Sequence, residues 1–372
     1  MSYSLQRVAS ILTQYSSILG VILVCGGASP SGGYVGGKYW HHPGAFHHGF
    51  KGLCSVFVTA AFAFGGTELV GLAAAETANP RKSLPTAVKQ VFWRITLFYI
   101  VALTLVGLLV PYTDKRLLNE TGQSSNAHAS PFVIAIKNAG IAGLPSVMNV
   151  VIMISVLSVG NSAVYGSSRT MAALAEQGQA PAFLAYIDRR GRPVFSIIVA
   201  SSFGLIAYVA ASNQQQVAFN WLIAISGLSS IFTWGSICLA HIRFRKAWRV
   251  QGHGLDELAF RSQAGVVGSW AGLIFNILVL IAQFWTGFAP IGYRDKTASA
   301  LVNNFFQAYL AAPIVISFYI AYKFRFKTKI MRTRDMDLHS GRRDLDLMYL
   351  VAEERAEQER WPVWKKVYKF FC

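Results

Sequence analysis

Long uncharged stretches alternate with polar segments along the chain, and each stretch is about as long as a bilayer is thick. A membrane-spanning helix needs about 20 mostly apolar residues, with a range of about 17 to 25. The pattern predicts eight spans, at residues 8–24, 52–75, 95–111, 146–168, 194–211, 218–240, 267–289 and 301–322. We expect an all-α polytopic membrane protein, with a transmembrane domain over residues 1–322 and a polar tail over residues 323–372.

Residues that interrupt helices fall at or near the ends of these predicted spans. The polar segment "SNQQQ" separates 194–211 from 218–240 and is short enough for a tight helical hairpin. Proline, which is tolerated at helix ends, occurs at Pro111, Pro131, Pro145, Pro181 and Pro193. The first apolar stretch also has features of a signal peptide. No clean small-residue cleavage site follows it, which favours a first span.

The composition supports a membrane protein. Hydrophobic residues make up 53% of the 372 residues and charged residues only 14%, whereas a soluble domain carries about 25% charged residues. Four scattered cysteines, Cys25, Cys54, Cys238 and Cys372, are too few for a disulfide framework. One bridge between Cys25 and Cys54 is conceivable because both are predicted near the same membrane face, but ordinary thiols are the favoured interpretation.

Lysine and arginine are distributed unevenly over the predicted loops. The net charge is +17, and with Met1 placed inside, the inner segments hold 27 of the 34 Lys and Arg residues. When the tail is left out, the inner segments still hold 14 and the outer segments 7. Because positively charged loops stay on the cytoplasmic side, this distribution predicts that both termini are cytoplasmic. It also explains the basic charge without a nucleic-acid partner.

The second span has two glycines and a carboxylate near its centre, in the stretch "FVTAAFAFGGTELVG". A carboxylate at mid-bilayer costs about 2.5 to 3.5 kcal/mol on insertion scales. A helix broken at Gly65 and Gly66 exposes backbone groups that must face protein or a water-filled cavity. Secondary transporters bind small charged solutes at such breaks, and Glu68 is a candidate proton carrier. The alternative is that the glycines only allow close helix packing and that Glu68 is paired with a neighbour.

Two further spans carry small or polar residues. Asn161 in the fourth span, and Ser226 with Gly227 in the sixth, either line a solute path or join helices by packing and hydrogen bonds. Both interpretations remain open for these residues. No catalytic motif and no Cys/His metal spacing is present in the sequence, so we do not expect an enzyme.

The predicted outer loops carry two other candidate features. The sequon "NET" makes Asn119 a candidate for N-glycosylation. Four histidines, His41, His42, His47 and His48, invite a metal-site interpretation, but no cysteine or carboxylate stands beside them. Their aromatic neighbours fit an interfacial belt instead, so we predict no metal site.

Several long strings resemble one transporter family. They are "GGYVGGKYWHHPGAF", "FKGLCSVFVTAAFAFGGTELVGLAAAETANPRKSLPTAVKQVFWRITLFYI", "SVLSVGNSAVYGSSRTMAALAEQGQAP" and "FNWLIAISGLSSIFTWGSICLAHIRFRKAW". These strings are similar to those of the fungal plasma-membrane amino acid permeases, and most similar to the general amino acid permease branch. That family belongs to the amino acid–polyamine–organocation superfamily. The resemblance implies a twelve-helix fold with two inverted five-helix repeats, of which this chain would hold helices 5–12.

The resemblance also implies roles for particular residues. The unwound backbone around residues 64–66 would meet the amino end of the substrate, Phe64 would act as a gate, and Glu68 would be a proton-linked gating carboxylate. The string "ETANPRKSLP" matches the family's cytoplasmic signature loop, with Glu76, Asn79, Pro80 and Arg81. The full set of expected substrate-binding residues is Phe64, Gly65, Gly66, Thr67, Asn161 and Ser226.

The function implied by the resemblance is proton-coupled symport of L-amino acids into the cell by alternating access. The proton gradient would drive it, without a cofactor, in the plasma membrane after transit through the endoplasmic reticulum. The tail string "RDMDLHSGRRDLDL" resembles a trafficking and stability segment, which implies ubiquitin-ligase adaptor partners. Cys372 after "KFF" is a candidate palmitoylation site, and with nearby lysines it favours contact with membrane lipid.

The family's first four helices, including the partner broken helix, have no counterpart in the sequence. We expect a truncated gene model or a partial product. The alternative function is a non-transporting membrane protein that acts as a fragment, an assembly partner or a regulator of a full-length permease.

Overall fold

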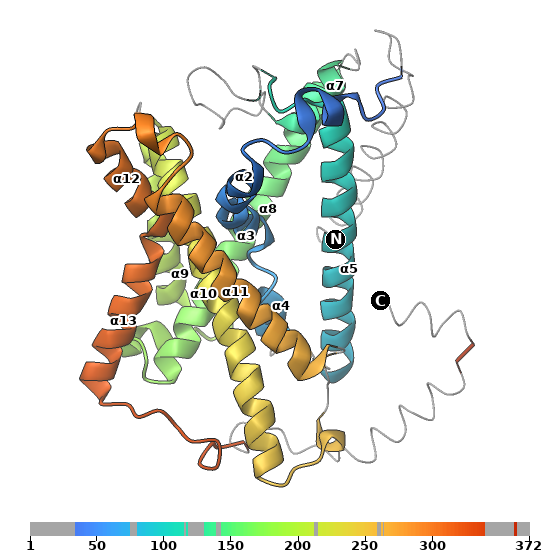
Figure 1. Cartoon of the computed structure of the whole chain (residues 1–372). Helices are drawn as coiled ribbons and strands as arrows, with labels where there is room; N and C mark the ends of the chain where they lie inside the picture. Colours follow the sequence, from blue (N-terminus) through green and yellow to red (C-terminus); the bar gives the residue numbers. More distant parts are fainter. Residues whose placement is uncertain are drawn as a thin grey trace. The chain divides into compact units, whose positions relative to one another are not determined.

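The computed structural model describes residues 34–74, 80–114, 117, 130–138, 143–211, 215–258, 262, 264–338 and 361–362. The regular elements in these ranges are all helices (Figure 1). The chain divides into two compact units, residues 1–47 with 91–218 and residues 48–90 with 219–372, and each is described by itself. The first predicted span, residues 8–24, lies outside the described residues.

Long apolar helices confirm the predicted fold class. Five stretches are long and apolar enough to cross a membrane: Gly49–Gly71, Leu84–Leu109, Leu144–Glu176, Val217–Val250 and Gly265–Asp295. A sixth is the helix pair α12 (Ala298–Tyr309) and α13 (Ala311–Phe326), which is bent by 57°. These stretches match six of the predicted spans, although several helices continue beyond the predicted ends.

The predicted span 194–211 consists of two helix types. The α-helix α9 (Val194–Ser202) is followed directly by the 3₁₀-helix η4 (Phe203–Ala211). The stretch Val194–Tyr208 is an apolar helix shorter than the five candidate spans, so the span 194–211 stays a prediction.

The first unit is built on α8 (Leu144–Glu176) and the later part of α5 (Pro80–Leu109). A short helix, α7 (Pro131–Asn138), lies in the predicted outer loop between them. Its buried residues Ile134 and Ala135 pack against Val106 and Leu109 of α5. The 3₁₀-helix η3 (Ala182–Ala185) and α9 both contact α8, and the buried Ser196 hydroxyl donates a hydrogen bond to the Leu184 carbonyl at 3.0 Å.

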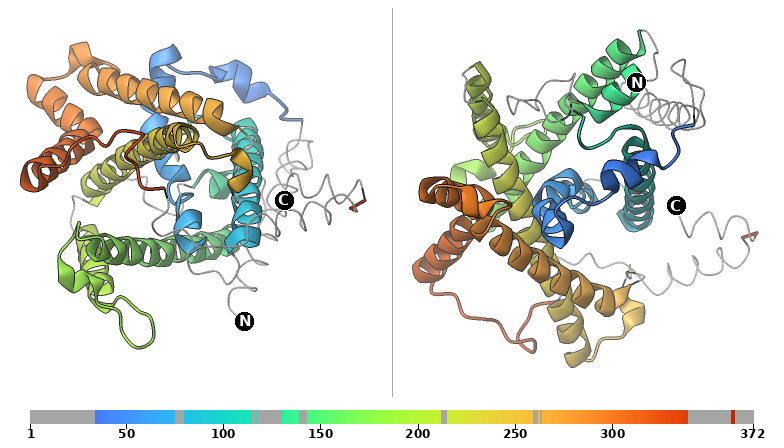
Figure 2. Two further views of the ribbon diagram at one scale, coloured as in Figure 1. Left: turned by 90° about the horizontal axis from the view of Figure 1, so that it is seen from below. Right: turned by 45° about the horizontal axis from the view of Figure 1, so that its top comes forward.

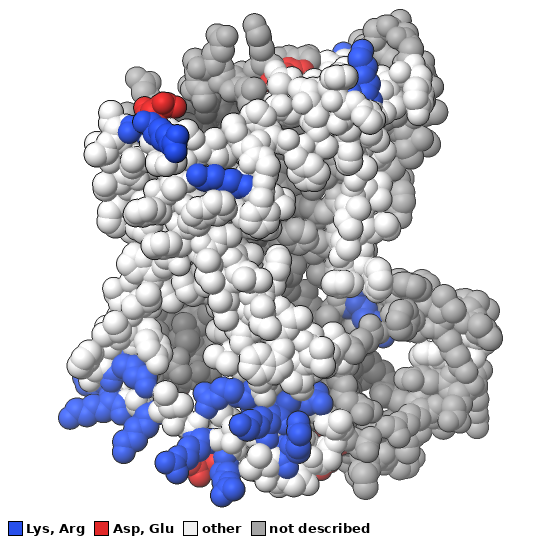
Figure 3. All heavy atoms as spheres, in the orientation of Figure 1, with Lys and Arg blue, Asp and Glu red and all other residues white. Residues whose placement is uncertain are grey.

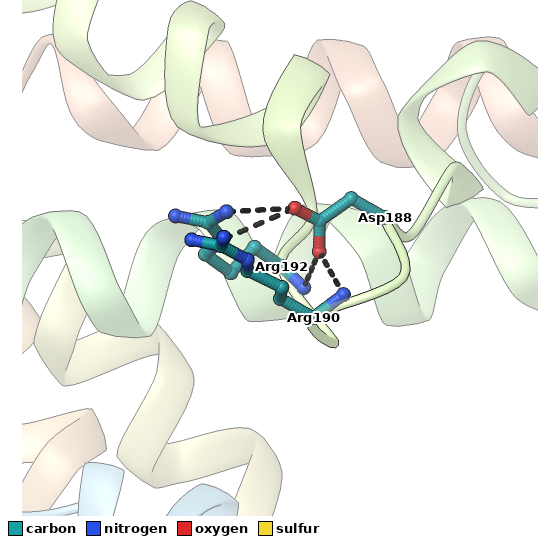
Figure 4. A network of polar contacts seen from close by, with 3 residues as sticks. All are labelled: Asp188, Arg190 and Arg192. Atoms are coloured by element: carbon teal, nitrogen blue, oxygen red, sulfur yellow. Dashed lines mark hydrogen bonds and ion pairs between the residues drawn. The ribbon is translucent and has the colours of Figure 1, made fainter.

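A small polar network closes the loop between η3 and α9 (Figure 4). One carboxylate oxygen of Asp188 accepts hydrogen bonds from the backbone N–H groups of Arg190 at 2.9 Å and Arg192 at 2.8 Å. The other oxygen accepts from the guanidinium of Arg192, with both contacts at 3.1 Å. The backbone N–H of Arg192 is the largest of the interactions that lower the pKa of Asp188 from its ordinary value.

The second unit is built on α10 (Gln215–Val250) and α11 (Gly265–Phe288). Three short helices, α2 (Gly49–Ser55), α3 (Phe57–Phe64) and α4 (Leu69–Ala74), make up the interrupted second span. The core joins α3, α10, α11 and the start of α13, and its buried residues are Val58, Ala61, Leu228, Ile231, Val279, Ala311 and Ala312. Three more short helices complete the described elements: η5 (Leu255–Glu257) and η6 (Tyr293–Asp295) in this unit, and η1 (Trp40–Gly44) in the first unit.

Two amide side chains join α11 to α12, which lies against it (Figures 1 and 2). Gln283 of α11 donates to the Ala308 carbonyl at 3.3 Å, and Asn304 of α12 donates to the Gly287 carbonyl at 3.2 Å. The bend after α12 has a local cause. Pro313 has no N–H for the carbonyl of Tyr309, and its ring would clash with that carbonyl in a straight helix.

In α10, α11 and α13 of the second unit, the apolar stretches carry no Lys, Arg, Asp or Glu. Lys and Arg side chains gather at the lower ends of α10 and α13 in Figure 3, below a band with few charges. Such a band, bordered by charged ends, is expected where helices cross the hydrocarbon core.

One predicted loop begins as a helix. Pro80 and Arg81 of the signature loop are the first two residues of α5. Proline at the first helical position lacks only an N–H that would have no partner there, so it starts a helix readily.

Candidate functional site

The second span is interrupted at its two glycines, as the sequence predicted. α3 ends at Phe64 and α4 begins at Leu69, and the residues between them, 65–68, form turns. Gly65 has an extended backbone (φ −56°, ψ 144°) and Gly66 has a φ of +91°. A positive φ strains residues that carry a Cβ, so Gly66 is required for this turn.

Local hydrogen bonds replace the helical pattern across the interruption. The N–H of Gly65 donates to the Phe62 carbonyl at 3.1 Å, and the N–H of Leu69 donates to the Gly66 carbonyl at 3.1 Å. These are bonds over three residues, so the chain passes through two tight turns before α4 resumes. The carbonyl end of α3 therefore faces the turn, and this end of a helix attracts cations.

Glu68 is held by donors from two sides. Its Oε1 accepts from the backbone N–H of Gly66 at 3.3 Å, and its Oε2 accepts from the indole Nε1–H of Trp234 at 3.3 Å. The side chain is half-buried. Both partners are donors, and a carboxylate accepts such bonds best when it is ionised. The Glu68 carboxylate therefore joins the Gly66 turn to α10.

One face of α10 contacts the interrupted span at three successive positions. A Cβ on Gly227 would lie 2.5 Å from the Val58 carbonyl oxygen, so α10 and α3 touch there backbone to backbone. Further along α10, the Ser230 hydroxyl oxygen would lie 3.6 Å from a Cβ on Gly65, and Trp234 then reaches Glu68. Residues spaced by three or four lie on one side of a helix. We call this row, Gly227, Ser230 and Trp234, the α10 strip.

Ser230 and Trp234 were not among the site residues predicted from the sequence. Ser226, which was predicted, lies one turn before Ser230 and accepts that hydroxyl's hydrogen bond through its carbonyl at 3.0 Å. The signal that points to Trp234 is the four-residue spacing of 226, 230 and 234, which places polar groups on one helix face. The structure thus places Gly65 and Glu68 against the strip, and Phe64, Gly66 and Thr67 are their neighbours in the chain.

The other predicted site residues lie elsewhere. Asn161 is exposed on α8 in the first unit, so its place in a substrate site stays a prediction. Glu76, Asn79, Asn119 and Cys372 are outside the described residues.

The cysteine and histidine predictions are partly tested. Cys54 and Cys238 are free thiols, and Cys54 is fully buried, whereas Cys25 is outside the described residues. Among the residues that the structure describes, no group of three or more His, Cys, Asp or Glu side chains is placed to hold a metal. His47 instead contacts Tyr112, with the ring Nδ1 3.2 Å from the hydroxyl oxygen.

The fold and the interrupted span define an integral membrane protein of the polytopic all-α class. A family model for amino acid permeases matches residues 8–334, and the chain belongs to that family. The chain is 56% identical to the general amino-acid permease GAP1 of Saccharomyces cerevisiae, over 95% of this chain and 59% of that protein.

Two more relatives give the same picture. The identity to the general amino-acid permease GAP2 of Candida albicans is 56%, over 95% of this chain and 60% of the relative. The identity to the histidine permease of Saccharomyces cerevisiae is 52%, over 92% of this chain and 57% of the relative. The chain therefore spans about three fifths of the length of these relatives. No solved structure matches it.

Proposed function

We propose that this chain carries out amino acid transport across the plasma membrane, by proton-coupled symport with alternating access. Family membership and the names of its relatives support amino acids as the substrate class. The observation that carries the proposal is the interruption of the second span at residues 65–68 beside the half-buried Glu68. Irregular backbone at membrane depth is tolerated where it lines a site or a cavity.

The substrate would bind at the interruption through its charged amino end. The carbonyl end of α3 attracts an ammonium group. In a regular helix the carbonyls of residues 64–66 would be hydrogen-bonded within the helix, whereas at a break such groups are free to bind a substrate. Phe64 is the gating residue in this proposal, and Thr67 and Ser226 supply hydroxyl groups. Asn161 is a further candidate from α8.

Glu68 would carry the proton. A neutral carboxyl group accepts more weakly from the Gly66 N–H and the Trp234 indole than a carboxylate does. Protonation would therefore loosen the turn that these two donors hold in place. A proton that binds better to one arrangement of the turn shifts the balance between the outward-open and inward-open states. This couples the proton gradient to substrate movement.

The test is uptake of labelled amino acids by a yeast strain that lacks its own permeases and expresses this chain. We expect uptake that rises as the external pH falls. Glu68→Gln should lower uptake at acidic pH by about 5- to 150-fold, the usual range for coupling between two sites, and should flatten the pH dependence. Glu176→Gln is the matched control, because Glu176 is exposed at the end of α8.

Two results would contradict the proposal. If Glu68→Gln keeps the pH dependence of the parent chain, Glu68 is not the proton carrier. If the parent chain reaches the cell surface and gives no uptake, the chain is a non-transporting membrane protein. In that case, co-expression with a full-length relative would show whether it assembles with a permease.

A further inference from the structure

A basic segment crosses the end of α13. Residues 323–334, "KFRFKTKIMRTR", contain six basic residues and no acidic residue. α13 ends at Phe326, and Lys327, with a φ of +47°, turns the chain out of the helix. We call this segment, residues 323–334, the basic strap.

Large apolar side chains alternate with the basic ones and are exposed. Phe324 is 80% exposed, Phe326 50%, Ile330 76% and Met331 56%. Outside a membrane, such side chains would lie in water beside charged groups. The combination of Lys or Arg with exposed aromatic and aliphatic side chains is typical of segments that lie in the membrane interface.

The basic strap is tied to the end of α10. The guanidinium of Arg243 donates to the Met331 carbonyl, and the amide of Gln251, just after α10, lies 3.4 Å from the carbonyl oxygens of both Thr333 and Arg334. Lys323 donates to the Thr328 carbonyl at 3.1 Å, which folds the strap back on α13. The strap is therefore held beside the helix ends where two spans leave the membrane.

The end of α10 adds to the same charged surface. Its last turns carry four more basic residues, Arg243, Arg245, Lys246 and Arg249. Figure 3 shows Lys and Arg side chains gathered over the lower ends of α10 and α13. Four acidic residues lie near in sequence, Asp256, Glu257, Asp335 and Asp337, against ten basic ones, so the positive charge is only partly balanced.

We propose that the basic strap is a binding surface for the head groups of anionic phospholipids. Its Lys and Arg side chains would contact lipid phosphates, while Phe324, Phe326, Ile330 and Met331 enter the boundary between head groups and acyl chains. The charge and the apolar side chains both fit this partner, because a soluble anion would use only the charge. The side predicted to be cytoplasmic is the side whose leaflet carries anionic lipids. The proposal does not depend on the transported substrate.

The test uses the full chain in lipid nanodiscs. The native cysteines are replaced by alanine, and Ile330→Cys carries a fluorophore that reports a less polar environment. We expect the emission to shift to shorter wavelength when phosphatidylserine is added to phosphatidylcholine nanodiscs, and high salt should weaken the shift. The midpoint of the phosphatidylserine titration is the measured quantity.

A charge variant and its control make the test specific. Lys327→Gln, Lys329→Gln and Arg332→Gln together should raise that midpoint by about tenfold or more. The control removes the same charge elsewhere, with Lys38→Gln, Lys137→Gln and Lys296→Gln, and should leave the midpoint unchanged.

Three outcomes would overturn the proposal. The first is that the labelled chain with an unchanged strap emits at the same wavelength with and without phosphatidylserine. This measurement does not use the charge variant, so a folding defect of that variant cannot affect it. The second is an equal effect of the strap and control variants. The third is a full shift in phosphatidylcholine nanodiscs on adding inorganic phosphate or an acidic peptide, which would make the surface a site for those partners.

Discussion

At the scale of single residues, Glu68 depends on a neighbour from a different helix. Trp234 donates to its carboxylate from α10, and Gly66 donates from within the same turn. A carboxylate at membrane depth is costly unless donors of this kind surround it. The two alternatives drawn from the sequence, a functional carboxylate or a paired one, are therefore compatible, because the pairing comes from a neutral donor rather than a cation.

At Gly227, adding a single methyl group should lower the stability of the protein. We expect Gly227→Ala to destabilise the protein by about 1 to 3 kcal/mol, because the new Cβ meets the backbone oxygen of Val58, which cannot rotate away. Gly235→Ala on the same helix is the control, since its Cβ would lie 3.7 Å from the Cβ of Asn276, an ordinary contact. Thermal unfolding of the two purified variants measures the difference. Equal melting temperatures would show that α3 and α10 are not in close contact.

Asp188 gives a prediction for pH. Its pKa is lowered in the folded chain, chiefly by the Arg192 N–H, below the ordinary value of 3.8. The stabilisation it gives is therefore present above that ordinary value and is lost as the pH falls through the lower folded value. Hydrogen-exchange protection of the Arg190 and Arg192 amides should hold at pH 5 and fall below about pH 4.

The matched variants for this loop are Asp188→Asn and Asp295→Asn. Asp188→Asn should lower the protection of the two amides already at neutral pH, and Asp295→Asn in η6 should leave it unchanged. Protection that is the same in all three chains would mean that the Asp188 network does not hold the loop.

At the scale of elements, the outer part of the interrupted span is fixed to α11. α2 and α3 both contact α11, and the Phe57 ring meets the Phe275 ring edge to face at 6.2 Å. The ammonium of Lys51 on α2 lies 5.5 Å from the Trp285 ring centre and 5.4 Å from that of Tyr293. A cation between two aromatic rings binds them without needing an acidic partner.

We expect Lys51→Met to loosen α2, since methionine keeps the length of the side chain and loses the charge. The loss should be about 0.5 to 2 kcal/mol, the range for cation–π contacts from exposed to desolvated sites. Lys296→Met removes a lysine just after η6 and serves as the control. Hydrogen exchange of the α2 amides is the measurement. Unchanged exchange in Lys51→Met would show that the aromatic pair does not hold α2.

At the scale of the whole molecule, hydrophobic periodicity and charge were enough to predict the fold class and the positions of the described spans. The thickness of the bilayer sets the length of a spanning helix, so the length of each apolar stretch predicts a span. The break at Gly65 and Gly66 was predictable for a similar reason, because two glycines and a carboxylate are costly in a lipid-facing helix.

Other features depend on contacts that a linear pattern does not contain. The helix α7 has only eight residues and forms because Ile134 and Ala135 meet α5. In the sequence, Trp234 looks like an ordinary apolar residue of its span. Only the structure shows that its indole donates to Glu68. Pro313 lies inside the predicted last span, and the sequence alone did not reveal that the span bends by 57° there.

The α10 strip also limits how the interrupted span can move. Gly227 and Trp234 are seven residues apart, so the backbone contact and the Glu68 contact lie about 10 Å from each other along α10. The contact at Gly227 is chiefly with the Val58 backbone, which cannot rotate away, whereas the indole contact is one hydrogen bond of 3.3 Å. A swing of the chain beyond Gly66 would break the second and keep the first. The pivot of such a swing would therefore lie at the Gly65–Gly66 turn, with α3 held on α10 at Val58 while the Trp234 hydrogen bond opens.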